Sequence, residues 1–315
     1  DKIYKGSDNM MWGDKRYKSF SYEMKNIFGS KIMKLSLDGG FTCPNRDGTL
    51  GNRGCIFCGE EGSGEFAASR TLDIKEQIES QKELLSNKWN SDKYIAYFQN
   101  FTNTYSTYED LKEKYNLAIS QEGVVGLAIA TRPDCLSEEI LDLLEEINKK
   151  TFLWIELGLQ TIHERTAKFI RRGYSLDYYD EAVKKLNERN IKVVTHLIIG
   201  LPHESKEDIL SSVKYVANTN TWGVKFHLLY IQKDTDIYEY YKKEPFHILS
   251  KEEYISLIVD SIEYLPSDMV IHRLTGDGKR SLLVEPLWSL GKRRLLSAID
   301  KELKIRNSFQ GYNIK

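Results

Sequence analysis

Six short, nearly continuous apolar runs recur along this chain of 315 residues and constrain its fold more than any other feature. They cover residues 31–37, 93–99, 125–131, 151–160, 192–200 and 224–231. Runs of this kind are typical of parallel strands that are covered on both faces. We therefore expect an α/β fold built on a parallel sheet.

The segments between these runs carry the helical repeat of apolar residues. Ile140 and Ile147, seven residues apart, lie on one predicted helix face behind Ser137, a favourable N-cap residue. Ser250 and Glu253 form a capping box before a similar face. Only six strand–helix units precede residue 250, whereas a complete eight-unit barrel typically takes about 250 residues. The sequence therefore predicts a partial (β/α)6 barrel.

Three segments are expected from these patterns. Residues 31–250 form the predicted core barrel. Residues 1–30 form an N-terminal extension, in which residues 1–10 lack a pattern and are interpreted as a tag remnant ahead of Met11. Residues 251–315 are predicted to pack on the barrel as a C-terminal strand–helix addition. Its strand is expected at 269–278, and its helix, at 286–304, carries Leu287, Leu290, Leu295, Ala298, Ile299 and Leu303.

Charge and hydropathy exclude several classes of function. Lys plus Arg total 45 and Asp plus Glu total 46, so the net charge is −1. A chain this neutral does not bind polyanions with its whole surface, and any nucleic-acid contact must use a local patch. No run approaches the roughly 20 apolar residues of a membrane-spanning helix, and no secretory signal is visible. We therefore expect a cytoplasmic protein without membrane contact.

Three of the four cysteines gather in the segment FTCPNRDGTLGNRGCIFCG, residues 41–59. Cys55 and Cys58 form a C-x-x-C pair, and eleven residues separate Cys43 from Cys55. The many glycines of the segment let a loop wrap closely around a compact object. In a reducing compartment such a group indicates metal or redox chemistry. Cys135 is remote in sequence and is expected to be a small buried side chain.

Four interpretations of this loop are open from the residues alone. A structural zinc site has four Cys or His ligands, and no histidine lies within a hundred residues of the loop. A thioredoxin-like motif needs no third cysteine, and inert buried cysteines are uncommon in so glycine-rich a segment. The fourth is a [4Fe–4S] cluster held by three thiolates, with one iron open to a substrate or cofactor.

Six motifs lie between residues 38 and 278, within a resemblance to a known family that runs from about residue 15 to residue 311. They are DGGFTCPNRDG, AYFQNFTNT, IATRPDCL, WIELGLQTIHERT, HLIIGLPHE and HRLTGDG. Together with the cysteines they resemble the radical S-adenosylmethionine (SAM) superfamily, in particular its YhcC/YtqA-type members. The usual cysteine spacing of the superfamily is C-x3-C-x2-C. The longer gap in this chain departs from it and is similar to the gap in the catalytic subunit of Elongator.

The resemblance implies that Cys43, Cys55 and Cys58 bind three irons of a [4Fe–4S] cluster and that SAM binds the fourth. A Gly-Gly motif that relatives carry at the end of the second strand is absent, as is a glutamate at the position of Ala130. Arg suits the SAM carboxylate because its planar fork can donate two parallel hydrogen bonds. The residues expected to bind SAM are Phe57, Gln99, Asn100, Thr102, Thr131, Glu156, Gln160, Arg172, His196, Ile198 and Gly200.

Purely structural interpretations of these residues stay open. The end of the second strand could be an ordinary capped loop, and His196 could be a core residue. Glu156, flanked by apolar residues, could be satisfied by a hidden partner, because a buried charge is rarely without one. Arg132 could pair with Asp134 in a turn, and Arg171 competes with its neighbour for the SAM carboxylate.

The resemblance also implies a reaction. The cluster reduces SAM, which yields methionine and a 5′-deoxyadenosyl radical that abstracts hydrogen from the substrate. The implied substrate is the anticodon loop of tRNA, where the wobble uridine's carboxymethylaminomethyl group becomes aminomethyl. An electron donor such as flavodoxin or ferredoxin is expected. Candidates for the substrate face are Arg132, His227, His272, Arg273, Asp277 and Lys279, of which Arg132, His227, Arg273 and Lys279 are the predicted catalytic set.

Local basic groups give partial support for RNA binding, although charges on helices are usually just a solvated face. They are Lys15/Arg16/Lys18, Arg171/Arg172, Lys184/Lys185/Arg189, Lys279/Arg280 and Lys292/Arg293/Arg294. The interleaved tyrosines could stack on an unpaired base. Three alternatives remain: a zinc-stabilised, non-catalytic RNA-binding protein, an electron-transfer protein that uses the cluster without SAM, and a radical SAM enzyme acting on a non-RNA small molecule.

Overall fold

The computed structural model describes residues 11–60, 62, 67–86 and 91–314, to which all structural statements below refer. The interpretation of residues 1–10 as a tag remnant lies outside these ranges. In the part of the chain that is described, no helix combines the length and the apolar character that crossing a membrane demands.

Seven strands form the main sheet, and the six apolar runs of the sequence account for six of them. The strands are β1 (Met33–Leu37), β2 (Tyr94–Phe98), β3 (Val124–Thr131), β4 (Phe152–Gln160), β5 (Lys192–Ile199), β6 (Gly223–Leu228) and β8 (Val270–Arg273). Their order is β1-β2-β3-β4-β5-β6-β8, and the pairs β1–β2, β2–β3, β3–β4 and β6–β8 are parallel. The predicted parallel sheet of an α/β fold is confirmed.

The described chain divides into two compact units. We call Met24–Gly158 together with Arg171–Val194 the N-terminal unit, and the remaining described residues the C-terminal unit. Each unit is described by itself. The expected segment boundaries at residues 30 and 250 stay predictions.

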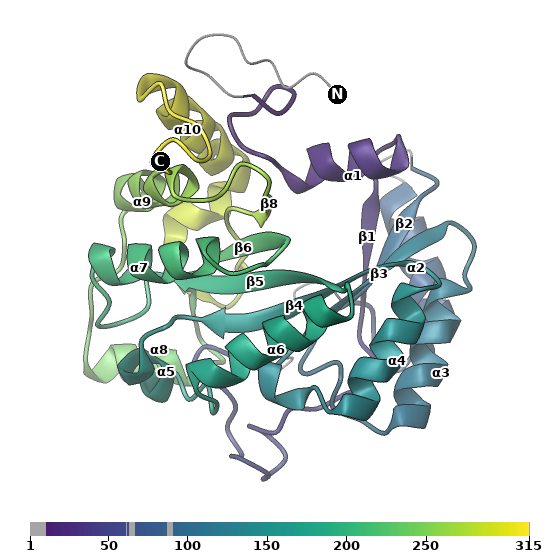
Figure 1. Ribbon diagram of the computed structural model, residues 1–315. Helices are drawn as coiled ribbons and strands as arrows, with labels where there is room; N and C mark the ends of the chain where they lie inside the picture. The colour runs from purple at the N-terminus through teal and green to yellow at the C-terminus, as the bar shows by residue number, and fades with distance from the viewer. Residues whose placement is uncertain (1–10, 61, 63–66, 87–90, 315) are drawn as a thin grey trace. The chain divides into compact units, whose positions relative to one another are not determined.

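In the N-terminal unit, three neighbouring helices cover one face of the strands β1 to β3 (Figure 1). Thr107 and Ser137 begin two of them, because their side-chain oxygens accept hydrogen bonds from backbone N–H groups of the first turn. Ile140 and Ile147 are buried, as the helical repeat predicts. The helices of this unit are α2 (Ile74–Ser86), α3 (Tyr108–Ile119), α4 (Glu138–Asn148) and α6 (Leu176–Glu188); α1 (Phe20–Phe28) starts just before it.

The C-terminal unit adds helices around β6 and β8. Its helices are α5 (Glu164–Phe169), α7 (Lys206–Ala217), α8 (Asp236–Lys243), α9 (Lys251–Glu263) and α10 (Lys292–Ile305). Complete capping boxes at Ser205 and Ser250 begin α7 and α9, the second as predicted. The helix α9 packs against both α7 and α10 (Figure 1). A short antiparallel pair joins β7 (Ile231–Gln232) to β9 (Leu283–Glu285).

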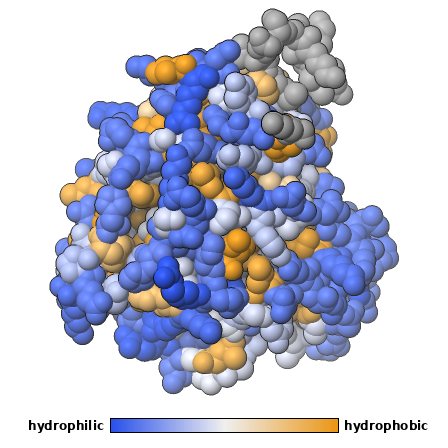
Figure 2. Space-filling model, turned by 60° about the vertical axis from the view of Figure 1, so that its left-hand side comes forward, coloured by the Kyte–Doolittle hydropathy of each residue, from blue (hydrophilic) through white to orange (hydrophobic). Residues whose placement is uncertain are grey.

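The predicted helix over residues 286–304 is partly wrong. The segment Leu287–Gly291 forms a 3-10 turn, and the α-helix begins only at Lys292. Gly291 favours this break because glycine is a poor helix former. Leu287 is consequently 57% exposed and Leu290 is 44% exposed. Other apolar residues are exposed as well. Figure 2 shows a face on which hydrophilic residues predominate and apolar residues form small groups.

Candidate active site

The loop after β1 gathers the three clustered cysteines in the N-terminal unit. Two tight turns shape it: the backbone N–H of Arg46 donates to Cys43 O (2.8 Å), and that of Cys58 donates to Cys55 O (3.0 Å). All of these cysteines are free thiols of intermediate exposure. The second turn brings the two members of the C-x-x-C pair close together.

The thiols share one electrostatic environment. Burial raises the pKa of the Cys55 thiol to about 12, the neighbouring Cys58 and Cys43 add to this rise, and Arg132 and Asn45 oppose it. Thiolates placed this close repel one another, so ionising all of them requires a nearby cation. A bound metal centre supplies that positive charge.

A multi-iron cluster fits these thiols without requiring them to meet at one ion. Within the described ranges, no group of three His, Cys, Asp or Glu side chains could hold a metal ion. Each thiolate of an iron–sulfur cluster binds its own iron, whereas zinc ligands converge on one ion at about 2.3 Å. The donor set of the loop, three thiols near a guanidinium, therefore fits a [4Fe–4S] cluster.

Asn45 ties the cysteine loop to a segment far along the chain. Its Nδ2 donates to Arg171 O (2.7 Å) and Arg172 O (3.3 Å) and lies 3.5 Å from Cys55 Sγ. Gly173, at φ +84°, permits this approach because a Cβ there would lie 2.7 Å from Asn45 Oδ1. Hydrogen bonds to ligand sulfurs tune iron–sulfur centres. Sequence analysis missed this residue, because nothing near it in sequence marks its partners.

Two arginines flank one tyrosine beside the loop. Arg132 forms the turn pair that the sequence allowed, binding Asp134 through Nε (2.9 Å) and Nη2 (2.8 Å), and its Nη1 lies 4.0 Å from Cys43 Sγ. The guanidinium groups of Arg132 and Arg172 lie 4.8 Å and 4.9 Å from the centre of the Tyr174 ring. Arg172 is 1% exposed and its Nε donates to Tyr174 O (3.0 Å). Tyr174 is a second residue that sequence analysis missed.

The segment after β2 presents a buried acceptor. Asn100 Nδ2 donates to Asp38 Oδ2 (3.0 Å), and Arg70 binds the same carboxylate through two nitrogens (3.1 and 3.2 Å). Asn100 Oδ1 is buried and has no hydrogen-bond partner among the residues that the structure describes. An unsatisfied buried acceptor is costly, and the ammonium group of SAM is a donor that would satisfy it. This residue therefore fits its predicted role, which stays a prediction.

The other predicted SAM residues near these strand ends are held by backbone and hydroxyl contacts. The backbone N–H of Thr102 donates to Thr42 O of the cysteine loop (3.2 Å). The hydroxyl groups of Thr131 and Thr104 share a hydrogen bond of 2.6 Å. Two further predicted residues of the same unit, both of intermediate exposure, are Phe57 and Gln99.

The structure provides the hidden partners that a buried Glu156 requires. Its carboxylate accepts hydrogen bonds from Tyr97 Oη (2.7 Å) and Trp154 Nε1 (3.0 Å). Lys34 Nζ lies 3.7 Å from the same carboxylate. The side chain of Glu156 is fully buried among these groups, so the structural interpretation accounts for its position. A role in binding SAM stays a prediction.

In the C-terminal unit, the strand ends carry the remaining predicted residues. Gln160, the last residue of β4, has φ +68°, and its buried Oε1 has no hydrogen-bond partner in the described ranges. Residues other than glycine are uncommon in this conformation, which often marks a functional site. The rings of His196 on β5 and His227 on β6 lie 4.9 Å apart, so the structure brings these two predicted residues together.

The remaining predicted site residues lie at or near the ends of β5 and β8. Gly200 follows β5 at φ +91°, and a Cβ there would lie 3.2 Å from Leu249 Cδ1. Arg273 ends β8, and its Nε donates to Thr275 O (2.7 Å). Lys279 lies in the exposed loop beyond, and Ile198 is buried. All of these roles stay predictions.

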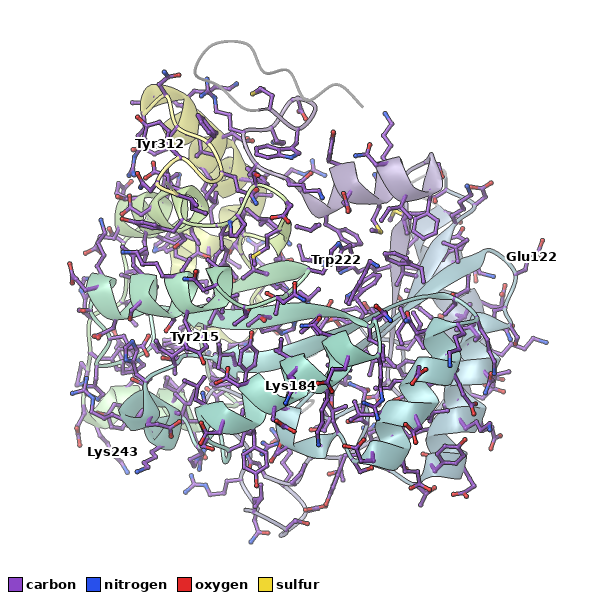
Figure 3. The ribbon with its side chains drawn as sticks, viewed as in Figure 1. Glu122, Lys184, Tyr215, Trp222, Lys243 and Tyr312 are labelled. Atoms are coloured by element: carbon purple, nitrogen blue, oxygen red, sulfur yellow. The ribbon has the colours of Figure 1, made fainter. Side chains whose placement is uncertain are left out.

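His272 has a packing environment. Its ring lies 4.8 Å from the rings of both Phe20 and Trp222, and Trp222 directly precedes β6 (Figure 3). These contacts suit the structural interpretation of a lone histidine. Asp277, another candidate for the substrate face, forms an ion pair with Lys292.

A half-buried carboxylate joins the turns that follow β4 and β5. Glu204 accepts a hydrogen bond of 2.5 Å from Thr161 Oγ1. Burial raises the pKa of Glu204, although the hydroxyl groups of Thr161 and Thr166 oppose the rise.

Comparison with known proteins identifies the family. The model of the radical SAM superfamily matches residues 48–216, and that of the radical SAM C-terminal domain matches residues 221–305. Protein YtqA of Bacillus subtilis is 46% identical over 298 residues, which cover 95% of this chain and 92% of that protein. A tRNA uridine(34) acetyltransferase of Methanocaldococcus infernus is 27% identical over 164 residues, which cover 51% of this chain and 30% of that protein.

A solved structure shares the fold. The archaeal Elp3 of Methanocaldococcus infernus, with an N-terminal deletion of residues 1–46, superposes with a TM-score of 0.68 at 19% identity, over 89% of this chain and 64% of that one. The predicted fold class, an α/β partial barrel of the radical SAM type, is thereby confirmed. The chain belongs to the radical SAM superfamily, and it is an enzyme that uses a [4Fe–4S] cluster and SAM.

Proposed function

We propose that the enzyme modifies tRNA at the C5 substituent of the wobble uridine in the anticodon loop, converting carboxymethylaminomethyl to aminomethyl. The observation that supports this substrate most is the likeness to a protein named for uridine 34 of tRNA, which is the wobble position. The likeness covers 51% of this chain and 30% of that protein.

The proposed reaction balances. Removing the carboxymethyl group as glyoxylate, with addition of water, takes two electrons from the substrate. When bound, the cluster and SAM supply reductive cleavage of SAM, which takes up two electrons overall as methionine and 5′-deoxyadenosine form. A low-potential donor such as flavodoxin or ferredoxin would start the cycle, and the substrate would return that electron.

The chain offers distinct groups to hold SAM. Asn100 Oδ1, buried and without a hydrogen-bond partner in the described part of the chain, would accept from its ammonium group. Arg172 would bind the SAM carboxylate through its planar fork. Cys43 and its two partners in the loop would hold the cluster. The protein's contribution is to position these groups and to exclude water.

The substrate's carboxylate needs a cation. The fork of Arg132 binds Asp134 at 2.8 and 2.9 Å. We assign the substrate carboxylate to Arg273, the last residue of β8, and to Lys279 in the loop that follows. His227, whose ring lies 4.9 Å from that of His196, is the proposed group for moving a proton to the departing amine.

The test is mass spectrometry of tRNA nucleosides from a strain that lacks the gene. Carboxymethylaminomethyl-uridine should accumulate, and the wild-type chain should restore the normal profile whereas Cys55→Ala should not. An unaltered nucleoside profile would refute the substrate while leaving the radical SAM class intact. Purified enzyme offered the modified tRNA and, separately, the free modified nucleoside distinguishes an RNA substrate from a small molecule.

A further inference from the structure

The structure sorts the basic groups of the sequence by whether carboxylates neutralise them. On α6, Lys185 lies 2.9 Å from Glu138, and Arg189 lies 2.8 Å from Glu138 and 3.2 Å from Asp142. Two of the three cations of this group are therefore paired. Only its third member, Lys184, exposed on the same helix (Figure 3), has no carboxylate contact within the described ranges.

The N-terminal basic group, residues 15–18, and the arginine pair at 171–172 also make contacts within the protein. Lys15 forms an ion pair with Asp300, and Lys18 lies 3.0 Å from Glu23. Arg16 donates to Ser308 O (3.2 Å). As described above, the second arginine of the pair 171–172 is buried against a tyrosine. None of these groups offers a cluster of exposed, unneutralised charge.

The last two basic groups of the sequence differ from the others in how few carboxylates neutralise them. We call their residues the C-terminal basic surface: Lys279, Arg280, Lys292, Arg293 and Arg294. Its arginines are all exposed, and none of the three forms an ion pair in the ranges that the structure describes. The ion pair between Lys292 and Asp277 joins the loop after β8 to the first turn of α10, so it brings the two sequence groups together. Residues 276–297 hold five cations and two carboxylates, in a chain whose net charge is −1.

Local stability does not account for these charges. Three of the cations occupy the first turn of α10, which contains no acidic residue. A helix dipole favours negative side chains at this end and disfavours positive ones. The exposed guanidinium groups of Arg293 and Arg294 therefore lie where the helix gains no stability from them.

We infer that the C-terminal basic surface binds the phosphate backbone of the RNA substrate. The inference rests on the proposed function. Guanidinium groups match phosphate oxygens through two parallel hydrogen bonds. The surface continues the loop that begins at Arg273 and contains Lys279, the residues assigned to the substrate carboxylate. A polymeric substrate whose reacting nucleotide lies there must place its flanking phosphates on the adjoining surface, and an acidic protein partner has no such requirement.

The experiment measures the binding of a tRNA transcript to the cluster-loaded enzyme by fluorescence anisotropy across a range of salt concentrations. The test variant is Arg280→Ala/Arg293→Ala/Arg294→Ala. The matched control, Lys184→Ala/Lys185→Ala/Arg189→Ala, removes the same charge from the neutralised group. Iron content and circular dichroism confirm that both variants are folded and loaded. The test variant should bind about tenfold to a hundredfold more weakly, and its salt slope should fall by about two, because each lost phosphate contact lowers it by about 0.7–0.9.

The outcomes separate this inference from the proposed function. If wild type binds the transcript and the test variant binds equally well, the inference is overturned while the proposed substrate stands. Equal weakening in both variants also overturns it, because net charge alone then explains the effect. If wild type does not bind tRNA, the proposed substrate fails and the inference fails with it. Unchanged tRNA binding together with slower reduction by flavodoxin would assign the surface to the electron donor instead.

Discussion

The arginines beside the cysteine loop and those of the C-terminal basic surface illustrate two uses of the same side chain. Arg132 and Arg172 are buried, and each has partners within the protein: a carboxylate, a tyrosine ring or a backbone carbonyl. Arg280 and Arg293 are exposed and have no ion pair among the described residues. Buried charges require partners, so partners identify the arginines that organise the cofactor loop. Exposed charges without partners remain available to a ligand.

The largest effect is expected in the cysteine loop, beside the buried arginines. Replacing Cys43, Cys55 or Cys58 singly by Ala should abolish 5′-deoxyadenosine formation and strip iron, because two thiolates hold the cluster poorly. The control is Cys135→Ala, which should retain both. Loss of iron from the Cys135 variant would contradict the assignment of three ligands.

A tenfold to hundredfold effect is expected at Arg172. Arg172→Lys keeps the charge but loses the planar fork and the Nε donor to Tyr174 O. A lost charge-assisted hydrogen bond costs about 1.5–3 kcal/mol, so SAM should bind about ten to a hundred times more weakly in equilibrium dialysis. Arg171→Lys is the matched control. If only the Arg171 variant lost affinity, the carboxylate contact would belong to that residue.

Asn45→Ala tests the bridge between the cysteine loop and residues 171–172. Two backbone carbonyls lose their donor, which should lower the free energy of unfolding by about 1–3 kcal/mol. Loss of the amide near Cys55 Sγ should also lower the reduction potential of the cluster, measured by EPR-monitored titration. Asn116→Ala, which removes a hydrogen bond to Lys112 O on α3, is the control. An unchanged potential would show that the amide does not act on the sulfur.

A smaller effect on tRNA binding is expected when a carboxylate that neutralises the cations of α6 is removed. Those cations then resemble the unpaired ones of the C-terminal basic surface. Glu138→Gln removes a partner of both Lys185 and Arg189. If unneutralised charge decides RNA contact, non-specific tRNA binding should strengthen slightly and its salt slope should rise by about one. Glu139→Gln, an exposed neighbour on the same helix turn, is the control. Identical slopes for both variants would show that neutralisation is the wrong criterion.

The smallest effect concerns Glu204, the half-buried carboxylate between the turns that follow β4 and β5. Its pKa is raised by burial, so the native state holds this proton more tightly than the unfolded state. Its contribution therefore favours folding at low pH and is lost as pH rises from the ordinary value of 4.5 through the raised pKa. Glu204→Gln should remove this part of the pH dependence of thermal unfolding, whereas Glu207→Gln should keep it. A parallel loss in both variants would contradict the assignment.

Local sequence patterns predict much of the fold. The apolar run at 125–131 becomes β3, which is buried along most of its length, and the pair Ser250 and Glu253 forms its capping box as expected. The predicted helix over 286–304 starts at too early a residue. Its apolar repeat continues through Gly291, but the α-helix begins only at Lys292. Periodicity records which residues are apolar, but the start of a helix also depends on capping and on glycine.

The candidate site was predictable only where its signal is local. The C-x-x-C turn and the pair of Arg132 with Asp134 involve residues within three positions of each other. Asn45, in contrast, binds backbone carbonyls 126 and 127 positions away. A carbonyl oxygen is present at every residue, so no side-chain pattern reveals which one an asparagine will reach. Tyr174 was missed because one of the two guanidinium groups that flank its ring belongs to Arg132, which is distant in the sequence.

The ion pair between Lys292 and Asp277 has a consequence for motion. It fastens the loop after β8 to the start of α10, so amide hydrogen exchange in the two segments should slow and quicken together, as in one cooperative opening unit. The pair is partly exposed, at 36% and 39% of its side chains, and exposed pairs of this kind are weak and screened by salt. Added salt therefore acts twice at this surface: it screens the attraction for phosphate, and it loosens the loop from the helix that carries the other cations.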